Sequence, residues 1–318
     1  MSVTRHDMKP LGRLDSHHRK GCRLHLVTVS LVLLVVLSGC GGVRRPDIVL
    51  ICLDSLRADH FTPGLTPNLW EFGNDSVVFH DVVSNAPWTT PSIASVFTGA
   101  FPATHGLNSE AHTLAAEFPP ISQDLVTLAE VLRQGGYATA AYVTHGPLAP
   151  HLGFDRGFDE YIEVDRTDGS DIKQIVDLGL RLLSSAESPI FLYLHSFEPH
   201  LPDVTGSYAG DIARMDSELG RFLEAVQRRN ALIAVFSDHG EDPSRASRRH
   251  GFDLKQDLLS VPLIVRDGLY AGVVSDPAQL VDLMPTILEF VDVRIPGSVQ
   301  LRIHLPTFGG GMKSLVLR

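Results

Sequence analysis

The sequence predicts an α/β fold with a doubly wound, mostly parallel sheet and helices on both of its faces. The main evidence is a set of continuous apolar runs, which is the pattern of parallel strands buried on both sides. These runs span residues 48–53, 138–143, 190–194, 232–236 and 261–265. Helical patterns lie at residues 125–133, 171–184, 210–228 and 277–291. Strand and helix therefore alternate along the chain, as they do in doubly wound sheets.

The ends of the predicted strands carry polar residues. The first strand reads Ile-Val-Leu-Ile-Cys-Leu and stops at Asp54, while Glu198 and Asp238 follow two later strands. Ligands bind doubly wound sheets at the carboxyl ends of the strands, so we expect the functional site there. The clearest helix, at residues 210–228, gathers its apolar side chains on one face. They are Ile212, Met215, Leu219, Phe222, Leu223 and Val226.

The first 39 residues have the pattern of an export signal. Basic residues precede an apolar run at residues 24–37, which is short for a membrane span. The run ends in Leu-Ser-Gly-Cys40, which resembles a bacterial lipoprotein signal; a short membrane anchor or an ordinary signal peptide is the alternative. Lipidated Cys40 would attach the protein to a membrane of the bacterial cell envelope, facing outside the cytoplasm.

The composition argues against nucleic acid as a partner. The chain has a formal net charge of −10, and removal of residues 1–39 would leave about −14. Such an acidic protein without a basic patch does not bind nucleic acid. Of the three cysteines, only Cys40 and Cys52 would remain, and Cys52 lies in an apolar strand, so no disulfide is expected.

Carboxylates, imidazoles and one hydroxyl gather near the predicted strand ends. Oxygen and imidazole groups are ligands for hard and borderline divalent cations. A hydroxyl beside such an ion can attack a phosphoryl or sulfuryl centre at neutral pH. The candidates are Asp54, Thr89, Glu198, His200, Asp238, His239 and His250. They are the set that a metal-dependent ester hydrolase needs.

Ordered sequence blocks run through residues 46–296. They read PDIVLICLDSLRAD from residue 46, TPNL from 66, WTTPSIASVFTG from 88, HG from 105, GFDRGFD from 153, HSFEPH from 195, SDHGE from 237, HG from 250, VPLIV from 261 and VDLMPT from 281. Together they closely resemble the sulfatase family of the alkaline-phosphatase superfamily. The resemblance implies an alkaline-phosphatase-like fold and a hydrolase that acts on ester bonds.

The resemblance also implies roles for individual residues. Thr89 falls at the position of the nucleophile, and Pro91 would open a helix, so that Thr89 faces free backbone amides that suit an anionic ester. Together with Thr89, one divalent metal ion would be held by Asp54, Asp238 and His239. Glu198, His200 and His250 resemble ligands of a second ion or, in relatives with one metal, contacts to the substrate oxyanion. The expected cofactor is therefore one or two ions of zinc, manganese, calcium or magnesium.

Several positions depart from the sulfatase pattern. Sulfatases proper carry Cys or Ser, oxidised to formylglycine, where this chain has Thr89, and an arginine where it has Ile93. The element that supplies a sulfate-binding lysine reads Val-Thr-His-Gly at residues 143–146, and the second of two paired aspartates is Ser55. These changes favour phosphate esters, and a sulfate-ester hydrolase that uses the unmodified threonine is the alternative. Glu198 stands where an aspartate is expected.

Other polar residues leave more than one interpretation open. Arg57 either bridges the metal carboxylates or contacts substrate, or it forms a structural ion pair. His195 is a further ligand, a partner of His200, or a core histidine. His105 is either a turn residue packed near the site or a ligand, and the turn residue is favoured. A basic loop contains Arg245, Arg248 and Arg249, and it is more typical of a solvated loop than of an anion site.

The predicted organisation has four parts. Residues 1–39 form the signal peptide, residues 40–46 a linker, residues 47–296 the catalytic domain, and residues 297–318 an atypical tail. The C-terminal subdomain usual in the family is expected to be short or missing. The expected substrate is a small-molecule, glycan or lipid ester. Two alternatives to hydrolysis remain, namely a phospho-alcohol transferase of the same superfamily and a degenerate member that binds a ligand without turnover.

Overall fold

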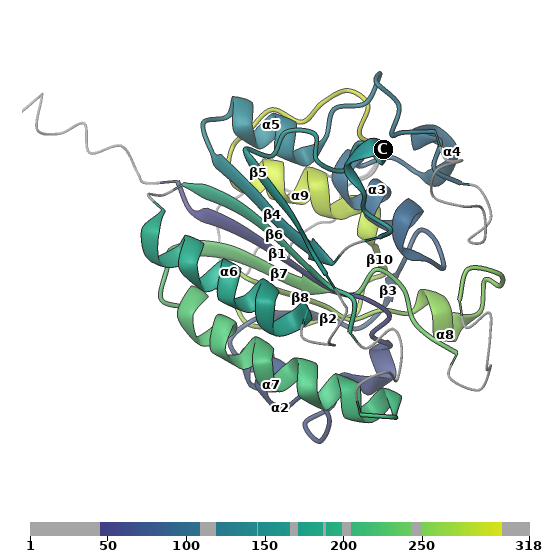
Figure 1. Cartoon of the computed structure of the whole chain (residues 1–318), viewed down its shortest axis with the longest axis vertical. Coiled ribbons are helices and arrows are strands. Elements are labelled where there is room, and N and C mark those ends of the chain that lie inside the picture. Colours follow the sequence, from purple (N-terminus) through teal and green to yellow (C-terminus); the bar gives the residue numbers. More distant parts are fainter. Residues whose placement is uncertain are drawn as a thin grey trace, which may run out of the picture. The chain divides into compact units, whose positions relative to one another are not determined.

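The computed structural model describes residues 45–108, 119–144, 146–165, 171–186, 189–198, 205–242 and 250–300. Its centre is an eight-stranded sheet with the strand order β5-β4-β6-β1-β7-β8-β2-β9 (Figure 1). The strands are β1 (Asp47–Leu53), β2 (Val77–Phe79), β4 (Ala138–Thr144), β5 (Glu160–Val164), β6 (Ile190–Ser196), β7 (Ala231–Phe236), β8 (Leu263–Arg266) and β9 (Gly272–Val274). A small second sheet pairs β3 (Val82–Val83) with β10 (Ala278–Gln279). The expected α/β fold is confirmed.

The sheet is parallel from β5 through β7 and mixed beyond that point. Strand β8 runs antiparallel to both β7 and β2, and β2 pairs in parallel with β9. Strand β1 lies between β6 and β7 in parallel register. Every residue of β1 is buried, as its continuous apolar sequence predicts.

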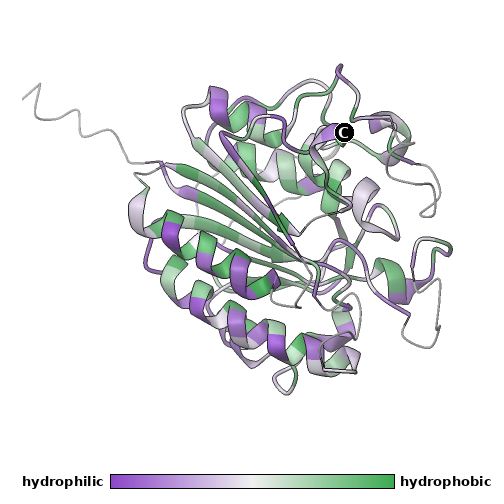
Figure 2. Ribbon diagram, in the orientation of Figure 1, coloured by the Kyte–Doolittle hydropathy of each residue, from purple (hydrophilic) through white to green (hydrophobic). Residues whose placement is uncertain are grey.

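Helices cover both faces of the sheet. On one face α2 (Pro67–Asn74), α6 (Asp171–Ser185) and α7 (Tyr208–Val226) pack against Val49 and Ile51 of β1. On the other face α3 (Thr89–Thr98), α5 (Leu128–Gln134) and α9 (Leu283–Phe290) pack against Ile48 and Leu50. Figure 2 shows α6 and α7 with mixed hydrophilic and hydrophobic sides, while the strands behind them are mostly hydrophobic. Two cores therefore form, one on each side of β1.

Shorter elements connect these layers. They are α4 (Pro102–His105), α8 (Gln256–Leu259) and the 3-10 turns η1 (Ala58–His60), η3 (Pro150–Leu152) and η4 (Leu280–Asp282). Within the described part of the chain, no helix is both long enough and apolar enough to cross a membrane. The predicted signal peptide and Cys40 lie outside the described residues.

The last predicted helix is shorter than its sequence pattern. The prediction covered residues 277–291, whereas α9 begins only at Leu283, after β10 and η4. Long-range hydrogen bonds explain the difference: the Ala278 amide donates to the Asp81 carbonyl, and the Val281 amide donates to the Asn85 side chain. Pairing with a distant segment thus overrides the local helical periodicity.

Helix α3 also begins earlier than expected. It starts at Thr89, so Pro91 is its third residue rather than its first. The absence of an amide proton on Pro91 still costs nothing, because the first amides of a helix have no acceptor within the helix.

One of the family-like blocks supports the scaffold. The Arg156 guanidinium donates to the carbonyls of Ser122 and Leu125 and to the carboxylate of Glu130. Gly157 follows with φ +89°, and a Cβ there would lie 2.1 Å from the Glu130 amide nitrogen. This block anchors the start of α5.

Candidate metal centre

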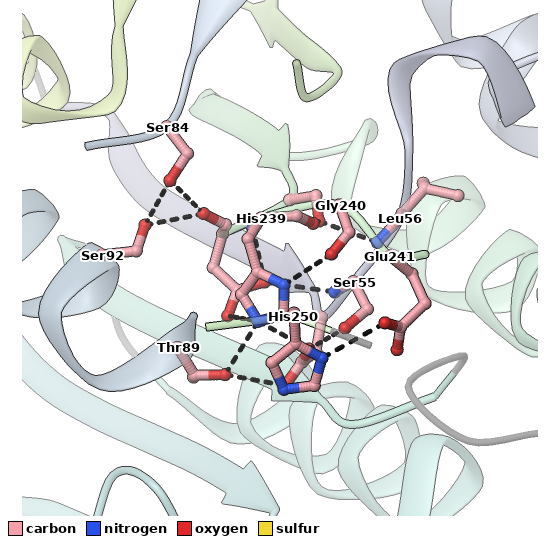
Figure 3. A network of polar contacts seen from close by, with 12 residues as sticks. Ser55, Leu56, Ser84, Thr89, Ser92, His239, Gly240, Glu241 and His250 are labelled. Carbon is pink, nitrogen blue, oxygen red and sulfur yellow. Dashed lines mark hydrogen bonds and ion pairs between the residues drawn. The ribbon is translucent and has the colours of Figure 1, made fainter. Parts of the chain in front are cut away.

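The candidate site lies where β1 and β7 end beside the start of α3. Asp54 follows β1 directly, and Asp238 and His239 follow β7. Because Cys52 pairs with Phe236 in the parallel register of these strands, Asp54 and Asp238 emerge at the same level. Thr89, the first residue of α3, reaches the same point from the helix layer above the sheet (Figure 3).

Four of the predicted site residues converge here, with side-chain atoms 3.2 to 3.5 Å apart. Thr89 Oγ1 lies 3.2 Å from Asp54 Oδ2 and 3.2 Å from His239 Nε2. His239 Nε2 in turn lies 3.5 Å from Asp54 Oδ1 and 3.5 Å from Asp238 Oδ2. All four side chains are buried, with Thr89 the most exposed at 3%.

Asp238 is fixed by backbone donors on one carboxylate oxygen only. Its Oδ1 accepts the amides of Ser55 at 3.2 Å and of His239 at 2.9 Å. Its carbonyl oxygen accepts hydroxyl groups from Ser84 and Ser92. Its Oδ2 is buried without a hydrogen-bond partner among the described residues. Ser55 adopts a φ of +63°, an uncommon conformation that places its amide toward this carboxylate.

The tautomer of His239 follows from its neighbour. His239 Nδ1 lies 2.8 Å from the Gly240 carbonyl, which can only accept, so Nδ1 carries the proton and Nε2 presents its lone pair to the centre. Burial lowers the pKa of His239, which keeps the ring neutral. Gly240 is required at this turn, because a Cβ there would lie 1.9 Å from the Asp257 carbonyl oxygen.

The donor set fits a divalent cation. Asp54, Asp238 and His239 each offer a ligand atom, and these atoms lie within 4.8 Å of one another. Burial, and secondly the charge of Asp238, raise the pKa of Asp54 well above its usual value. The site contains two buried carboxylates, one of them with an unpartnered oxygen, and a neutral imidazole. A bound cation would compensate this buried negative charge. These three residues would hold one ion next to Thr89, and their roles as ligands stay predictions.

The residues predicted to bind a second ion do not form a comparably close cluster among the described residues. The His250 ring lies beside His239, with 4.6 Å between ring centroids, and its Nδ1 lies 3.2 Å from Glu241 Oε1. Glu198 forms an ion pair with Arg214 of α7. Burial and the neighbouring Asp171 raise the pKa of Glu198 to about 9. His200 lies outside the described residues.

Glu241 lies beside the predicted site residue His250, and the sequence pattern assigned it no role. Its side chain is fully buried, Oε1 faces His250, and Oε2 has no hydrogen-bond partner within the described residues. The signal was present in the sequence, because Glu241 closes the block that begins at Ser237. Only the fold brings it to His250, which follows nine residues later.

Two other candidates contact residues of the scaffold. Arg57 forms ion pairs with Asp59 and Asp257, and its guanidinium also donates to the Glu241 carbonyl at 3.1 Å, so its role at the site stays a prediction. His105 accepts the Leu107 amide on Nδ1 at 3.1 Å, so its Nε2 carries the proton and faces the Pro91 carbonyl at 3.1 Å. His105 therefore ties α4 to α3, as expected of a turn residue.

The position of the sulfatase arginine is apolar in this structure. Ile93 is completely buried in the core between α3 and the sheet. The basic loop with Arg245, Arg248 and Arg249 lies outside the described residues.

Comparison with known proteins decides the family. Residues 46–293 match the family model described as Sulfatase. The chain belongs to the sulfatase family. The expected family is therefore confirmed, and the matched range includes Asp54, Thr89, Asp238 and His239.

Similar proteins carry different activities in their names. An uncharacterized pyrophosphatase/phosphodiesterase of Schizosaccharomyces pombe is 22% identical over 65% of this chain and 47% of its own length. Arylsulfatase G of Mus musculus is 31% identical over 40% of this chain and 25% of its own length. The chain thus spans about half, or less, of these curated relatives. The phosphonate monoester hydrolase of Agrobacterium radiobacter shares the fold, with a TM-score of 0.65 at 18% identity over 79% of this chain and 74% of that one.

Proposed function

We propose that this protein cleaves phosphate esters with Thr89 as its nucleophile and a divalent metal ion as its cofactor. The observation that carries the proposal is the position of the Thr89 hydroxyl, 3.2 Å from both Asp54 Oδ2 and His239 Nε2 at the start of a helix. A threonine hydroxyl is a weak nucleophile unless a base or a metal activates it. Asp54 Oδ2 is close enough to Thr89 to act as the base, and the group of Asp54, Asp238 and His239 could hold the metal.

The residues of the chain supply acceptors for the proton that the reaction releases. Thr89 Oγ1 would bond to phosphorus while the bond from phosphorus to the leaving oxygen breaks. The Thr89 hydroxyl donates to Asp54 Oδ2 at 3.2 Å, so its proton passes to this oxygen. Water then attacks the phosphothreonine, releases phosphate and restores the Thr89 hydroxyl. The metal ion, when bound by Asp54, Asp238 and His239, supplies positive charge that favours the ionised nucleophile and the developing phosphoryl charge.

The substrate anion is expected to bind at the N-terminus of α3. The first amides of a helix lack acceptors within the helix and point outward, and the helix dipole favours negative charge there. Thr89 is the first residue of this ten-residue helix, so a phosphoryl group bonded to its oxygen would lie against those amides. The N-terminus of α3 and the nucleophile would therefore contact the same anion.

The preference for phosphate rests on the residue types around this position. Threonine cannot be converted to formylglycine, and the arginine of sulfatases is replaced by the buried Ile93. A hydrolase without these groups lacks the formylglycine nucleophile of sulfatases. It also lacks the arginine that could pair with the charge of a sulfate monoanion. The substrate class is a small-molecule, glycan or lipid phosphate ester.

The test is an ester panel with matched threonine variants. The full chain, loaded with Mn²⁺ or Zn²⁺, is assayed on a phosphomonoester, a phosphodiester, a phosphonate monoester and an aryl sulfate. We expect the phosphorus esters to react faster. Thr89→Ala should lower turnover at least about 100- to 1,000-fold, comparable with the loss of a key donor. Thr89→Ser should retain measurable activity because it keeps the hydroxyl.

The neighbouring threonine provides the control. Thr90 is equally buried, but its hydroxyl donates to the Pro147 carbonyl at 3.0 Å. Thr90→Ala removes the same atoms as Thr89→Ala, and it should therefore leave turnover within about tenfold of the wild-type value. Equal turnover of Thr89→Ala and wild type would refute the nucleophile, and a preference for the aryl sulfate would refute the substrate class.

Two further outcomes separate the remaining alternatives. If an added alcohol is phosphorylated instead of water, the protein is a transferase that resolves the same phosphothreonine differently. If metal binds but no ester in the panel reacts, the proposal fails and the chain is a binding member of the family.

A further inference from the structure

A second cluster of ligand groups lies one residue layer beneath the candidate metal centre. Side chains alternate between the faces of a strand, so Cys52 points to the same face as Asp54. On the neighbouring strand β6, His195 is the register partner of Cys52. Cys52, His195 and Asp238 each offer one ligand atom, and these atoms lie within 4.8 Å of one another.

Three nitrogen and oxygen atoms of this cluster are not satisfied by the described part of the protein. Both ring nitrogens of His195 and the Oδ2 of Asp238 are buried without a hydrogen-bond partner among the described residues. His195 and Cys52 are completely buried, and Cys52 is a free cysteine. Buried polar groups nearly always have a partner, so an imidazole with two unpartnered nitrogens needs an explanation. A core histidine would donate at least one hydrogen bond, as His105 does.

The ligand types differ from those of the layer above. Asp54, Asp238 and His239 offer oxygen and imidazole, which suit hard and borderline ions. Cys52 adds sulfur, and a thiolate with an imidazole and a carboxylate is a donor set that favours zinc-like ions over magnesium or calcium. Asp54 Oδ2 lies 3.8 Å from His195 Nε2, so an oxygen that could serve as a fourth ligand is close.

We infer that Cys52, His195 and Asp238 form a binding position for a thiophilic divalent cation such as Zn²⁺, Co²⁺ or Cd²⁺. Binding replaces the thiol proton of Cys52, which is released to solvent, and joins the sulfur to the ion. Asp238 connects this position to the centre that Thr89 faces. The choice of metal would then decide which position an ion occupies: that of Cys52, that of Asp54 and His239, or both.

The experiment is a Co²⁺ titration of the metal-free full chain followed by absorbance. A thiolate bound to Co²⁺ gives an intense charge-transfer band in the near ultraviolet, which oxygen and nitrogen ligands do not give. We expect the band in the wild type and in a Cys22→Ser/Cys40→Ser variant, which retains only Cys52. We expect none in Cys52→Ser. Excess Zn²⁺ should abolish the band, while excess Mg²⁺ should not.

Further variants distinguish ligation from a structural effect. His195→Gln should weaken the Co²⁺ affinity read from the band at least about tenfold, as expected when a group of the coordination sphere is lost. Thr89→Ala should keep the band and lose turnover, so this inference and the proposed function fail separately. If Cys52→Ser does not fold, X-ray absorption of Zn²⁺ bound to the Cys22→Ser/Cys40→Ser protein decides, with a sulfur neighbour expected at about 2.3 Å. A missing band in the wild type, a band that survives in Cys52→Ser, or a zinc shell without sulfur overturns the inference.

Discussion

Replacement of Asp238 by asparagine should change the stability of the protein in opposite directions with and without metal. The ligand atoms of Asp54 and Asp238 lie within 4.8 Å of one another. Two unit charges at that distance repel by about 3.5 kcal/mol at an effective dielectric constant of about 20. Partial protonation of Asp54, whose pKa is raised, reduces this cost. The metal-free Asp238→Asn protein should therefore be more stable than the wild type at pH 7, by up to about 3 kcal/mol.

The substitution keeps the contacts that fix this side chain. Oδ1 can still accept the amides of Ser55 and His239. The amide nitrogen takes the position of Oδ2, 3.5 Å from His239 Nε2, which is an acceptor in the assigned tautomer. The gain should disappear when metal is added, because an ion at 100 times its dissociation constant stabilises the wild type by about 2.7 kcal/mol and binds the variant more weakly.

Urea unfolding in the presence of a chelator and with saturating Mn²⁺ measures both effects. Asp216 is the matched control, because it is also buried but its carboxylate accepts three hydrogen bonds from Asn68 and Leu69. Asp216→Asn should destabilise the protein in both conditions, by about 1.5–3 kcal/mol. If Asp238→Asn destabilises the metal-free protein as Asp216→Asn does, or gains as much from Mn²⁺ as the wild type, the reasoning about an electrostatically frustrated metal site is wrong.

Three further predictions concern other parts of the chain. Burial lowers the pKa of His105 from 6.5 to about 4, so the unfolded chain binds the additional proton and stability should fall as pH drops from about 6.5 to 4. The full contribution is about 3 kcal/mol, and pH-dependent unfolding of His105→Gln should show a flatter profile. Gly157→Ala should cost at least about 2 kcal/mol more than Gly106→Ala in urea unfolding. Both glycines have positive φ, yet only at Gly157 would the new Cβ meet backbone, whereas at Gly106 nothing lies within 4 Å; equal losses would show that the scaffold relaxes freely. Cys40→Ser should release the protein from membranes in cell fractionation, since the acyl chains would be lost. Unchanged detergent partitioning of that variant would contradict the lipoprotein signal.

The sequence by itself determined the fold class and the strands of the site. The continuous apolar character of β1 and β7 requires burial on both faces of the sheet. This requirement depends on only a few consecutive residues, so it can be predicted from the sequence. The polar residues that end these strands then had to meet at one edge of a parallel sheet. The strand ends therefore placed Asp54 and Asp238 at one edge before the structure was known, and the resemblance to the sulfatase family grouped them with His239 and Thr89.

Tertiary structure decided what depends on contacts between distant segments. Residues 277–282 have a helical pattern but pair with the segment around Asp81 and Asn85, since those hydrogen bonds outweigh local preference. Glu241 gains its neighbour His250 only because the intervening loop returns to the site. Cys52 and His195 are separated by more than a hundred residues, and only the register of β1 against β6 makes them neighbours. Register is set by the packing of both sheet faces together, and so no single segment of the sequence contains it.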